Sequence, residues 1–464
     1  MGVIDELKHA VKGHILTKEE ELLPYKTDAS YFSGSKPMAV LLPSDVSEVS
    51  NILKICNREG INVISRGGGT SLTGSATVLT NSIVLAMTRM NRIIHISSED
   101  RYAIVEPGVR IDDLNYELSE IGFMYPPDPG SSIAATVGGS ISTNAGGLRG
   151  VMYGSTKEWV LGLQVVLSDG TVIETGGRVL KRSAGYDLTA LFVGSEGTLG
   201  IITLATLKIT PLPERIGRVI AFYDSIERAG AATAIIKKSG LTPITAEFMD
   251  KVSLDSISKN MGLSFSDSGN SDYMLIVDIA STDESLNRHL EKALSLIKGT
   301  GPRSVRIIYD ETEIRNITNS RKGLYSSILS ERDREGQYAV MGDIVVPPST
   351  LSNALLDIRN LVGKYGFKVA LFGHIGDGNI HANIIVNPSD AKEMERVSAL
   401  MNELGRIALI NGGSVSAEHG IGLEKKRLLR MEMEYKESSR NIELMTSIKA
   451  VFDKKGILNR GKLL

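Results

Sequence analysis

The order of apolar and polar residues along the chain changes its character near Pro213. Before this position, short apolar runs end in glycine-rich loops, and the amphipathic segment 46–56 follows a capping pattern at Asp45 and Glu48. After it, apolar runs alternate with long segments whose apolar residues recur at helical spacing. We therefore expect the second half to be an α+β or split βαβ domain built on one sheet.

The periodicity assigns most of the chain to particular elements. Strands are expected at 38–42, 62–65, 83–86, 103–105, 160–167, 171–174, 201–210, 217–223, 242–248, 273–279, 303–308, 338–346, 367–373 and 380–386. Helices are expected within 1–30 and at 46–56, 225–239, 283–298, 349–365 and 389–410.

Three glycine-rich loops follow strands in the first half. They are Arg66–Gly74, the long stretch Tyr125–Gly154 and Phe192–Gly200. The prolines within Pro126–Pro129 exclude a helix there, and the glycines beyond them let main chain approach a ligand closely. A long surface loop is the alternative interpretation, because Gly and Pro are common in all loops.

Two common phosphate-binding motifs are excluded. Gly69–Gly74 has the glycine spacing of a P-loop, but Ser75 stands where that motif needs a lysine. No G-x-G-x-x-G opens a helix after a strand, so the usual dinucleotide fingerprint is missing. Three separate loops fit a large cofactor that is contacted at several points.

Composition narrows the class of protein. The chain has 464 residues, 42% of them apolar and 23% charged, with a net charge of −2. These values predict a soluble, cytoplasmic protein of two or three domains with no nucleic-acid partner. A single cysteine, Cys56, excludes an internal disulfide. No window reaches the ~18 apolar residues of a membrane span, and Asp5 and Glu6 interrupt any secretory signal.

The segment Phe372–Asn383 is a predicted hairpin that carries two histidines. Asp377-Gly378 favours a two-residue type I′ turn, which places His374 opposite His381. Opposed residues share a face, so the two imidazoles can bind one metal ion, and Asn383 projects from the same face. Glu418-His419 offers a carboxylate and a third imidazole from a glycine-rich connector, around Ser416–Gly422. A structural role is the alternative for any histidine, and we prefer it for His9, His14, His95 and His289.

In combination, R-G-G-G-T-S-L-T-G, Y-P-P-D-P, N-A-G-G and G-S-E-G-T-L-G-I-I-T resemble the FAD domain of the vanillyl-alcohol-oxidase (PCMH) type. The chain is most similar to the branch of glycolate oxidase D-subunits, D-lactate dehydrogenases and D-2-hydroxyglutarate dehydrogenases, from about Tyr31 to Leu464. The resemblance implies an α+β protein with four parts. These are a helical segment 1–34, a FAD-binding domain of two α/β subdomains at 35–212, a ferredoxin-like substrate (cap) domain at 213–410, and a segment 411–464 that returns to the FAD domain.

The resemblance also assigns the cofactor contacts. It implies that the first loop cradles the FAD pyrophosphate, the second holds the flavin and the third supports the nucleotide end. The residues implied are Arg66, Gly67, Gly68, Gly69, Thr70, Ser71, Leu72, Pro129, Thr136, Val137, Gly138, Asn144, Gly147, Glu196, Gly197, Ile201, Ile202 and Asn459. Some relatives attach the flavin through a histidine where this chain has Thr70, so we expect non-covalent FAD.

The catalytic roles follow from the same resemblance. It implies that His374, His381 and Glu418 bind one divalent metal ion and that His419 is the general base. Zinc is the favoured metal, with iron and manganese as alternatives. The expected reaction is oxidation of a D-2-hydroxy acid to the 2-oxo acid, with hydride transfer to the flavin.

Asn383 and Arg321 are candidates for binding the substrate carboxylate, and a solvated helix charge is the alternative for Arg321. The chain departs from the 2-hydroxyglutarate enzymes at Tyr325 and Met341, where they carry a threonine and a lysine for a second carboxylate. A monocarboxylate such as D-lactate or glycolate therefore fits better.

Other interpretations stay open. One is a non-redox flavin transferase of the alkyl-glycerone-phosphate synthase type, and another is a flavin-binding subunit of a larger oxidase complex. The electron acceptor is also open among quinone, cytochrome and electron-transfer flavoprotein. The sequence also leaves open whether the chain forms a homodimer and whether it lies peripherally at a membrane.

Overall fold

The computed structural model describes residues 2–12, 14–263, 265, 269, 271–333 and 336–464. The chain forms two compact units. Unit 1 comprises Met1–Gly146, Ser155–Leu212 and Glu418–Leu464, and unit 2 comprises Gly147–Gly154 and Pro213–Ala417. The change of unit at Pro213 coincides with the change in sequence pattern. The sequence did not indicate that 147–154, the end of the second glycine loop, belongs with unit 2.

The described part of unit 1 contains two larger sheets, which form its two α/β subdomains. The first has the order β1 (Ile15–Leu16), β2 (Ala39–Leu41), β4 (Ser82–Ala86) and β3 (Asn62–Arg66), with β2, β4 and β3 parallel. The second is antiparallel, in the order β5 (Ile93–Ser97), β6 (Tyr102–Val105), β10 (Ile201–Lys208), β8 (Val160–Val166) and β9 (Val172–Gly176). A short pair, β7 (Phe123–Met124) and β11 (Thr210–Pro211), lies apart from both.

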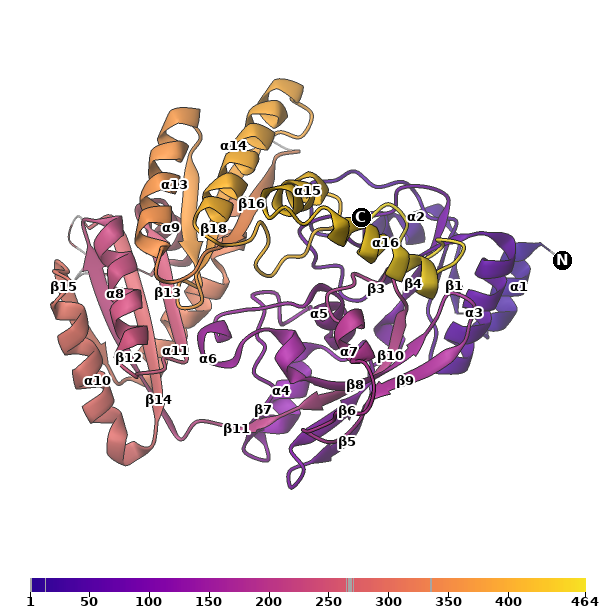
Figure 1. Ribbon diagram of the computed structural model, residues 1–464, viewed down its shortest axis with the longest axis horizontal. Helices are drawn as coiled ribbons and strands as arrows, with labels where there is room; N and C mark the ends of the chain where they lie inside the picture. The colour runs from indigo at the N-terminus through magenta and orange to yellow at the C-terminus, as the bar shows by residue number, and fades with distance from the viewer. Residues whose placement is uncertain (1, 13, 264, 266–268, 270, 334–335) are drawn as a thin grey trace. The chain divides into compact units, whose positions relative to one another are not determined.

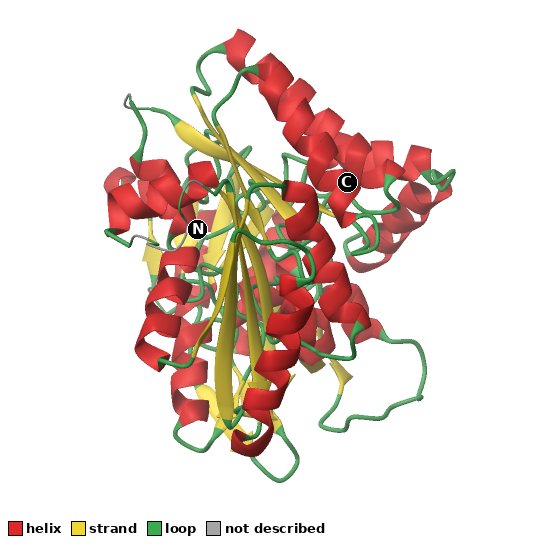
Figure 2. Ribbon diagram, turned by 90° about the vertical axis from the view of Figure 1, so that its left-hand side faces the viewer, coloured by secondary structure: helices red, strands yellow, loops and turns green. Residues whose placement is uncertain are grey.

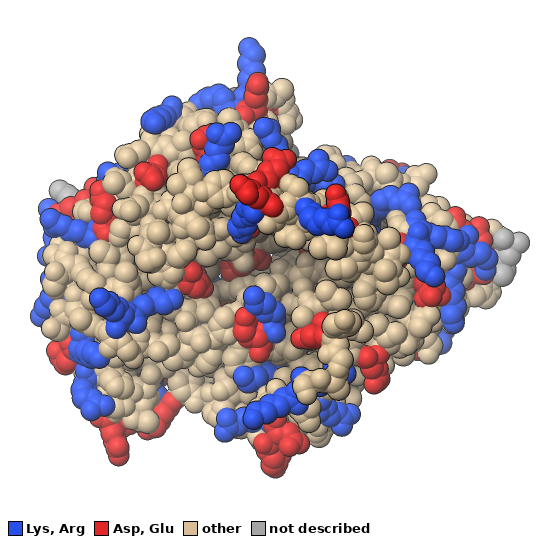
Figure 3. Space-filling model, viewed as in Figure 1, with Lys and Arg blue, Asp and Glu red and all other residues tan. Residues whose placement is uncertain are grey.

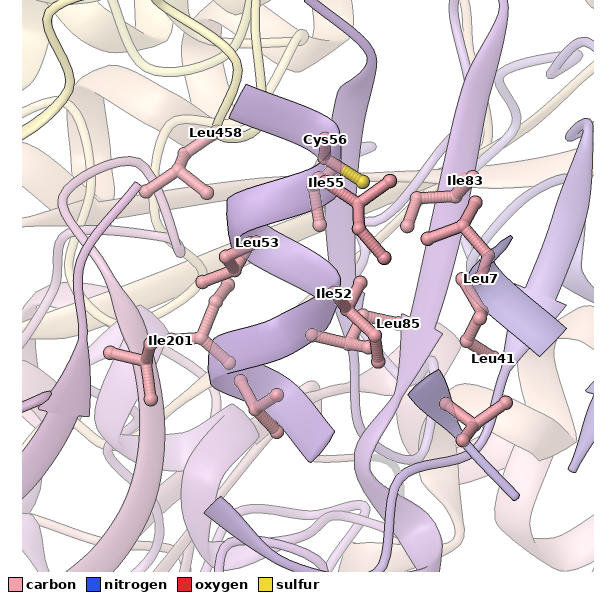
Figure 4. Close-up of a cluster of buried hydrophobic side chains, with 14 of the residues drawn as sticks. Leu7, Leu41, Ile52, Leu53, Ile55, Cys56, Ile83, Leu85, Ile201 and Leu458 are labelled. Carbon is pink, nitrogen blue, oxygen red and sulfur yellow. The ribbon is translucent and has the colours of Figure 1, made fainter. Parts of the chain in front are cut away.

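Helix α3 (Val46–Glu59) organises the core of unit 1. It begins where the capping pattern predicts, because the Asp45 carboxylate accepts a hydrogen bond from the Glu48 amide at 2.9 Å. Its apolar face packs against both sheets, as Figure 4 shows for Leu53, Ile83 and Ile201. Leu458, from the last residues of the chain, completes this cluster and is fully buried.

The other helices of unit 1 lie around these sheets. They are α1 (Val3–Ala10), α2 (Glu19–Leu22), α4 (Ile111–Ser119), α5 (Val137–Thr143), α7 (Leu188–Phe192), α15 (Lys426–Tyr435) and α16 (Arg440–Phe452), with 3₁₀ turns at Leu23–Tyr25, Met87–Arg89 and Thr156–Trp159. The expectation of helix within 1–30 was wrong at Ile15, which is in β1 and pairs with Leu41.

Unit 2 is a seven-stranded sheet between two layers of helices (Figures 1 and 2). The strand order is β15 (Ser304–Ile308), β12 (Arg215–Tyr223), β14 (Tyr273–Ser281), β13 (Thr245–Asp250), β17 (Val369–Gly373), β18 (Asn379–Val386) and β16 (Tyr338–Val345), with every pairing antiparallel. One layer holds α8 (Ile226–Lys238), α10 (Asp283–Lys298), α13 (Leu351–Tyr365) and α14 (Ala391–Ile410). The other holds α9 (Lys251–Met261), α11 (Glu311–Lys322) and α12 (Leu324–Ser330). A short helix, α6 (Gly150–Tyr153), packs near β13.

The surface is consistent with the small net charge. Lysine and arginine side chains are interspersed with aspartate and glutamate over the face shown in Figure 3, and neither sign dominates it. Among the helices within the described ranges, none combines the length and the apolar character needed to cross a membrane.

Candidate active site

The first two glycine loops meet inside unit 1. A Cβ atom added at Gly67 would collide with Thr136 Oγ1, and one at Gly68 would collide with the Ala134 carbonyl oxygen. Only glycine allows this close approach. An open cavity of about 480 Å³ borders the contact and is lined in part by Gly68, Ala134 and Thr136. The loops thus leave room beside them for part of a large ligand.

Arg66 anchors the first loop rather than pointing freely from it. Its guanidinium donates to the carbonyl oxygens of Thr27 at 2.7 Å and Pro24 at 3.2 Å. Burial lowers the pKa of Arg66. The Arg66 guanidinium is thus bound by carbonyl oxygens of the chain itself.

The third glycine loop is hydrogen-bonded to the connector that carries Glu418 and His419. The buried Glu196 carboxylate accepts hydrogen bonds from the amides of Ile421 at 2.7 Å and Gly422 at 2.8 Å. Burial raises the pKa of Glu196 to about 7, against the lowering effect of these two amides and of nearby lysines. Asn459 donates to the Glu196 carbonyl oxygen at 2.6 Å, so the end of the chain supports the same loop.

The connector also contacts the other two glycine loops of unit 1. The Thr73 hydroxyl donates to the His419 carbonyl oxygen at 3.3 Å. A Cβ atom at Gly146 would lie 2.5 Å from Glu418 Oε2, so Glu418 packs directly on the second loop. His419 Nε2 lies 3.9 Å from Glu418 Oε1. The predicted base therefore lies against the loop expected to hold the FAD pyrophosphate, and one predicted metal ligand lies against the loop expected to hold the flavin.

The histidine hairpin of unit 2 forms, but with a different register. Phe372 pairs with His381, and the Asn379 amide donates to the His374 carbonyl oxygen at 3.2 Å. His374 therefore lies opposite Asn379, and the expected pairing with His381 across a two-residue turn was wrong. A shift of two residues preserves the face, because side chains alternate with a period of two. The two imidazoles still meet, with ring centroids 5.5 Å apart and planes at 87°.

Charged partners that the sequence did not reveal surround the two histidines. Glu247 Oε1 lies 2.7 Å from His374 Nδ1, and its other oxygen lies 2.8 Å from the Arg321 guanidinium. Asp343 Oδ1 lies 3.8 Å from His381 Nδ1, and its other oxygen accepts from the Ala417 amide at 3.2 Å. Glu247 and Asp343 occupy ordinary strand positions on β13 and β16, and only the pairing of strands distant in sequence brings them to the site.

These residues extend a polar row across one face of the sheet. Arg218 on β12 pairs with Asp278 on β14, and Thr245 on β13 donates to Asp278 at 2.7 Å. Along β13, Glu247 follows Thr245 on the same face and leads to the two histidines. Helix α11 covers this row, since Arg218 donates to its Ile314 carbonyl oxygen and Arg321 is one of its residues.

Two side chains at this face have unused hydrogen-bonding atoms. Asn383 is 1% exposed, and neither atom of its amide has a hydrogen-bond partner among the described residues. Arg321 is 5% exposed and stacks on Phe372 at 4.6 Å, and its Nε likewise makes no hydrogen bond in the described part of the chain. Buried polar atoms of this kind are costly unless a ligand satisfies them.

The predicted site residues are divided between the units. The cofactor residues from Arg66 to Asn459 lie in unit 1, except Gly147, which the compact units assign to unit 2. His374, His381, Arg321 and Asn383 lie in unit 2, and Glu418 and His419 lie in unit 1.

Comparisons with known proteins agree with this architecture. The family "FAD binding domain" matches residues 37–176, and "FAD linked oxidases, C-terminal domain" matches residues 212–463. The glycolate oxidase subunit GlcD of Bacillus subtilis is 36% identical, covering 95% of this chain and 92% of that protein. A probable mitochondrial D-lactate dehydrogenase of Danio rerio is 33% identical, covering 94% and 86%.

Solved structures show the same fold. p-Cresol methylhydroxylase aligns with a TM-score of 0.80 at 18% identity, covering 98% of this chain and 95% of that one. An alkyldihydroxyacetonephosphate synthase aligns with a TM-score of 0.76 at 17% identity, covering 99% and 84%. The architecture is therefore that of the PCMH-type FAD-binding proteins, as expected from the motifs. The chain belongs to the FAD-linked oxidases.

Proposed function

We propose that this protein is a FAD-dependent dehydrogenase that oxidises a D-2-hydroxy acid to the 2-oxo acid. The observation that carries the proposal is the pair of buried, neighbouring imidazoles of His374 and His381 on the same sheet face as the amide of Asn383, which has no hydrogen-bond partner among the described residues. The names of the relatives, glycolate oxidase subunit and D-lactate dehydrogenase, support a small hydroxy acid as substrate.

The donor set fits a divalent metal ion. Because a carboxylate only accepts, the Glu247 contact favours a proton on His374 Nδ1 and leaves Nε2 with a lone pair for a ligand. We propose Glu418 as the third ligand. It follows Ala417, whose amide is bonded to Asp343 beside His381. Zinc is favoured, with iron or manganese as alternatives. A bound metal ion would lower the pKa of the substrate hydroxyl.

Other residues of the protein would transfer the proton and bind the substrate carboxylate. His419 accepts the hydroxyl proton as general base, and the hydrogen bond from Thr73 to its carbonyl oxygen holds it beside the first glycine loop. The Asn383 amide and the Arg321 guanidinium bind the substrate carboxylate. FAD, bound without a covalent link because Thr70 offers no attachment group, supplies the hydride acceptor.

The surroundings of Asn383 favour a substrate with one carboxylate. Its cross-strand neighbour on β16 is Met341, a buried apolar side chain on the same face. A second carboxylate placed there would lack a cationic partner at this position. D-Lactate and glycolate are therefore the favoured substrates.

An anaerobic panel of D- and L-2-hydroxy acids tests the proposal. D-Lactate or glycolate should bleach the flavin absorbance near 450 nm, and an added dye should restore it with one equivalent of 2-oxo acid formed. A transferase of the alkyl-glycerone-phosphate synthase type would give no oxidised product. A flavin that no hydroxy acid of the panel reduces would contradict the proposed reaction.

The partners and the cellular setting belong to the same proposal. The reduced flavin requires an acceptor, and quinone, cytochrome and electron-transfer flavoprotein are the chemical alternatives. We propose a cytoplasmic protein that works alone, as a homodimer or as a subunit of a larger oxidase, with no nucleic-acid partner. The dye in the assay replaces the acceptor, so the test of the reaction does not depend on which of these is correct.

A further inference from the structure

Glu247 contacts both His374 and Arg321, two residues to which the proposed reaction gives separate roles. It is 1% exposed on β13, a central strand of the sheet in unit 2. One carboxylate oxygen contacts His374 Nδ1 at 2.7 Å, and the other contacts the Arg321 guanidinium at 2.8 Å. Both partners are buried, so each contact is shielded from water.

The geometry matches a known way of orienting a histidine ligand. A histidine that binds a metal through one ring nitrogen commonly donates the other N–H to a carboxylate, which fixes the tautomer and the ring orientation. Glu247 occupies this place for His374. At His381 Nδ1, by comparison, Asp343 Oδ1 lies at 3.8 Å, which is beyond hydrogen-bond range.

Arg321 gives this arrangement its charge balance. A buried carboxylate beside a neutral imidazole alone would be costly, and the guanidinium 2.8 Å away offsets that cost. Arg321 is itself held by stacking on Phe372, whose ring also contacts the His381 ring at 5.4 Å. The contacts thus form a closed ring that includes both imidazoles, together with Glu247, Arg321 and Phe372.

We propose that Glu247 is a positioning residue that holds His374 with Nε2 directed to the metal ion, and that Arg321 holds Glu247 in this role. The inference rests on the metal site proposed above and adds to it a residue that does not touch the ion. It also gives Arg321 a second task besides binding the substrate carboxylate.

The test measures zinc affinity in the full-length, FAD-loaded protein after chelator treatment, by competition with a chromophoric chelator. Wild type should bind one zinc ion. Glu247→Gln retains the shape and one acceptor but loses the charge, and it should weaken zinc binding about 10–100-fold. Glu247→Ala should weaken it further. Arg321→Gln should also weaken zinc binding several-fold, whereas a role in substrate binding alone would leave zinc affinity unchanged.

Thr245→Val is the matched control. Thr245 lies on the same strand and face, and its buried hydrogen bond goes to Asp278 rather than to a histidine. This variant should lose stability while keeping the zinc affinity of wild type. Cobalt(II) in place of zinc adds a spectroscopic readout, because its visible bands should change in Glu247→Gln and stay unchanged in Thr245→Val.

The outcomes separate the two proposals. If wild type binds zinc and Glu247→Gln binds it equally well with the same cobalt spectrum, the role of Glu247 is overturned and the metal site stands. If Thr245→Val weakens zinc binding as much as Glu247→Gln, the effect is one of general stability and the inference is also overturned. A wild-type protein that binds no metal ion would overturn the metal site and this inference together.

Discussion

His374 and His419 have different surroundings, and these predict different losses when each is removed. His374 directly follows β17 and contacts Glu247, whereas His419 lies on the connector, where its carbonyl oxygen accepts from Thr73. His374→Ala should lose the metal ion, substrate binding and flavin reduction together. His419→Ala should keep the metal ion and a near-normal substrate Kd while flavin reduction slows ~10²–10⁴-fold, as expected for loss of a general base.

Elemental analysis and single-turnover flavin reduction over a range of substrate concentrations distinguish the two variants. Flavin reduction at the wild-type rate in His419→Ala would show that another group takes the proton.

At this scale the sequence predicted the chemical groups but not their partners. His374, His381 and Asn383 were predicted from a local pattern, since alternation along one hairpin decides which residues share a face. Glu247 and Asp343 could not be found in this way. Their roles depend on the order of strands in the sheet, which local periodicity does not encode.

The hairpin shows why an element can be predicted correctly and its register wrongly. Asp377-Gly378 favours a two-residue turn, but the Asn379 side chain donates to Asp343 and to the Ile344 carbonyl oxygen at 3.0 and 2.9 Å. These bonds to β16 fix Asn379 opposite His374 and widen the turn. Tertiary hydrogen bonds thus override the local turn preference.

Helices α9, α11 and α12 were not predicted, because polar residues make up much of their buried faces. Ser256 of α9 and Ser327 of α12 are buried and hydrogen-bonded to each other at 3.0 Å. A face that packs through hydroxyl groups lacks the apolar periodicity on which the prediction depends. The β5 strand was also missed; only one of its five residues is buried.

The ion pair between β12 and β14 should be a major contributor to the stability of unit 2. Arg218 and Asp278 form two hydrogen bonds of 2.6 and 2.8 Å, and both side chains are almost fully buried. Asp278→Asn leaves the guanidinium uncompensated and should cost about 3–5 kcal/mol in the free energy of unfolding. Asp255→Asn, which removes the exposed pair with Lys251, should change it by less than about 0.5 kcal/mol.

Denaturant unfolding of both variants measures the difference. Equal effects of the two substitutions would mean that burial does not decide the strength of the Arg218 pair.

The pKa of Glu196 predicts a pH dependence of stability in unit 1. Burial raises this pKa from 4.5 to about 7, so folding favours the protonated form. Its contribution to stability is fully present below pH 4.5 and is lost as the pH rises through about 7. The free energy of unfolding of wild type minus that of Glu196→Gln should therefore fall between pH 5 and 7.5, by at most about 1.4 kcal/mol per pH unit.

Thermal or denaturant unfolding of both proteins across this range gives the difference. The comparison stops below pH 8 because Lys462, whose pKa burial lowers to about 8, acts in the opposite direction above that value. A difference that is constant with pH would show that Glu196 does not titrate in this range.

For the molecule as a whole, the cofactor should be separable from the chain. The first glycine loop offers Thr70 where some relatives have a histidine for covalent attachment, so acid precipitation should leave the yellow flavin in the supernatant. Absorbance of the two fractions near 450 nm is the measurement, with a boiled sample as a second release method. Flavin that stays with the denatured polypeptide would mean that another residue attaches it.

The chain passes from unit 1 to unit 2 at Pro213 and returns to unit 1 at Glu418. The change at Pro213 is visible as a change of pattern, and the resemblance implied that the end of the chain returns to the FAD domain. The expected domain bounds, with a return at 411, stay a prediction; the compact units change at Glu418 and place 147–154 in unit 2. The transfer depends on contacts such as the close packing of Val151 on Gly376, which join segments far apart in sequence.

The late return of the chain to unit 1 has a consequence for biosynthesis. Ile457 and Leu458 are fully buried in the core cluster around α3, and the Val63 amide donates to the Ile457 carbonyl oxygen at 2.8 Å. A ribosome adds these residues only after it has made all of 213–417, which takes roughly 10–40 s at ~5–20 residues per second. During that interval the nascent N-terminal half exposes an incomplete apolar surface. The sheet of unit 2, by contrast, needs no strand from beyond Val386 and is complete before Ile457 and Leu458 are made. Chaperones that shield nascent chains should therefore act chiefly on the first half of this polypeptide.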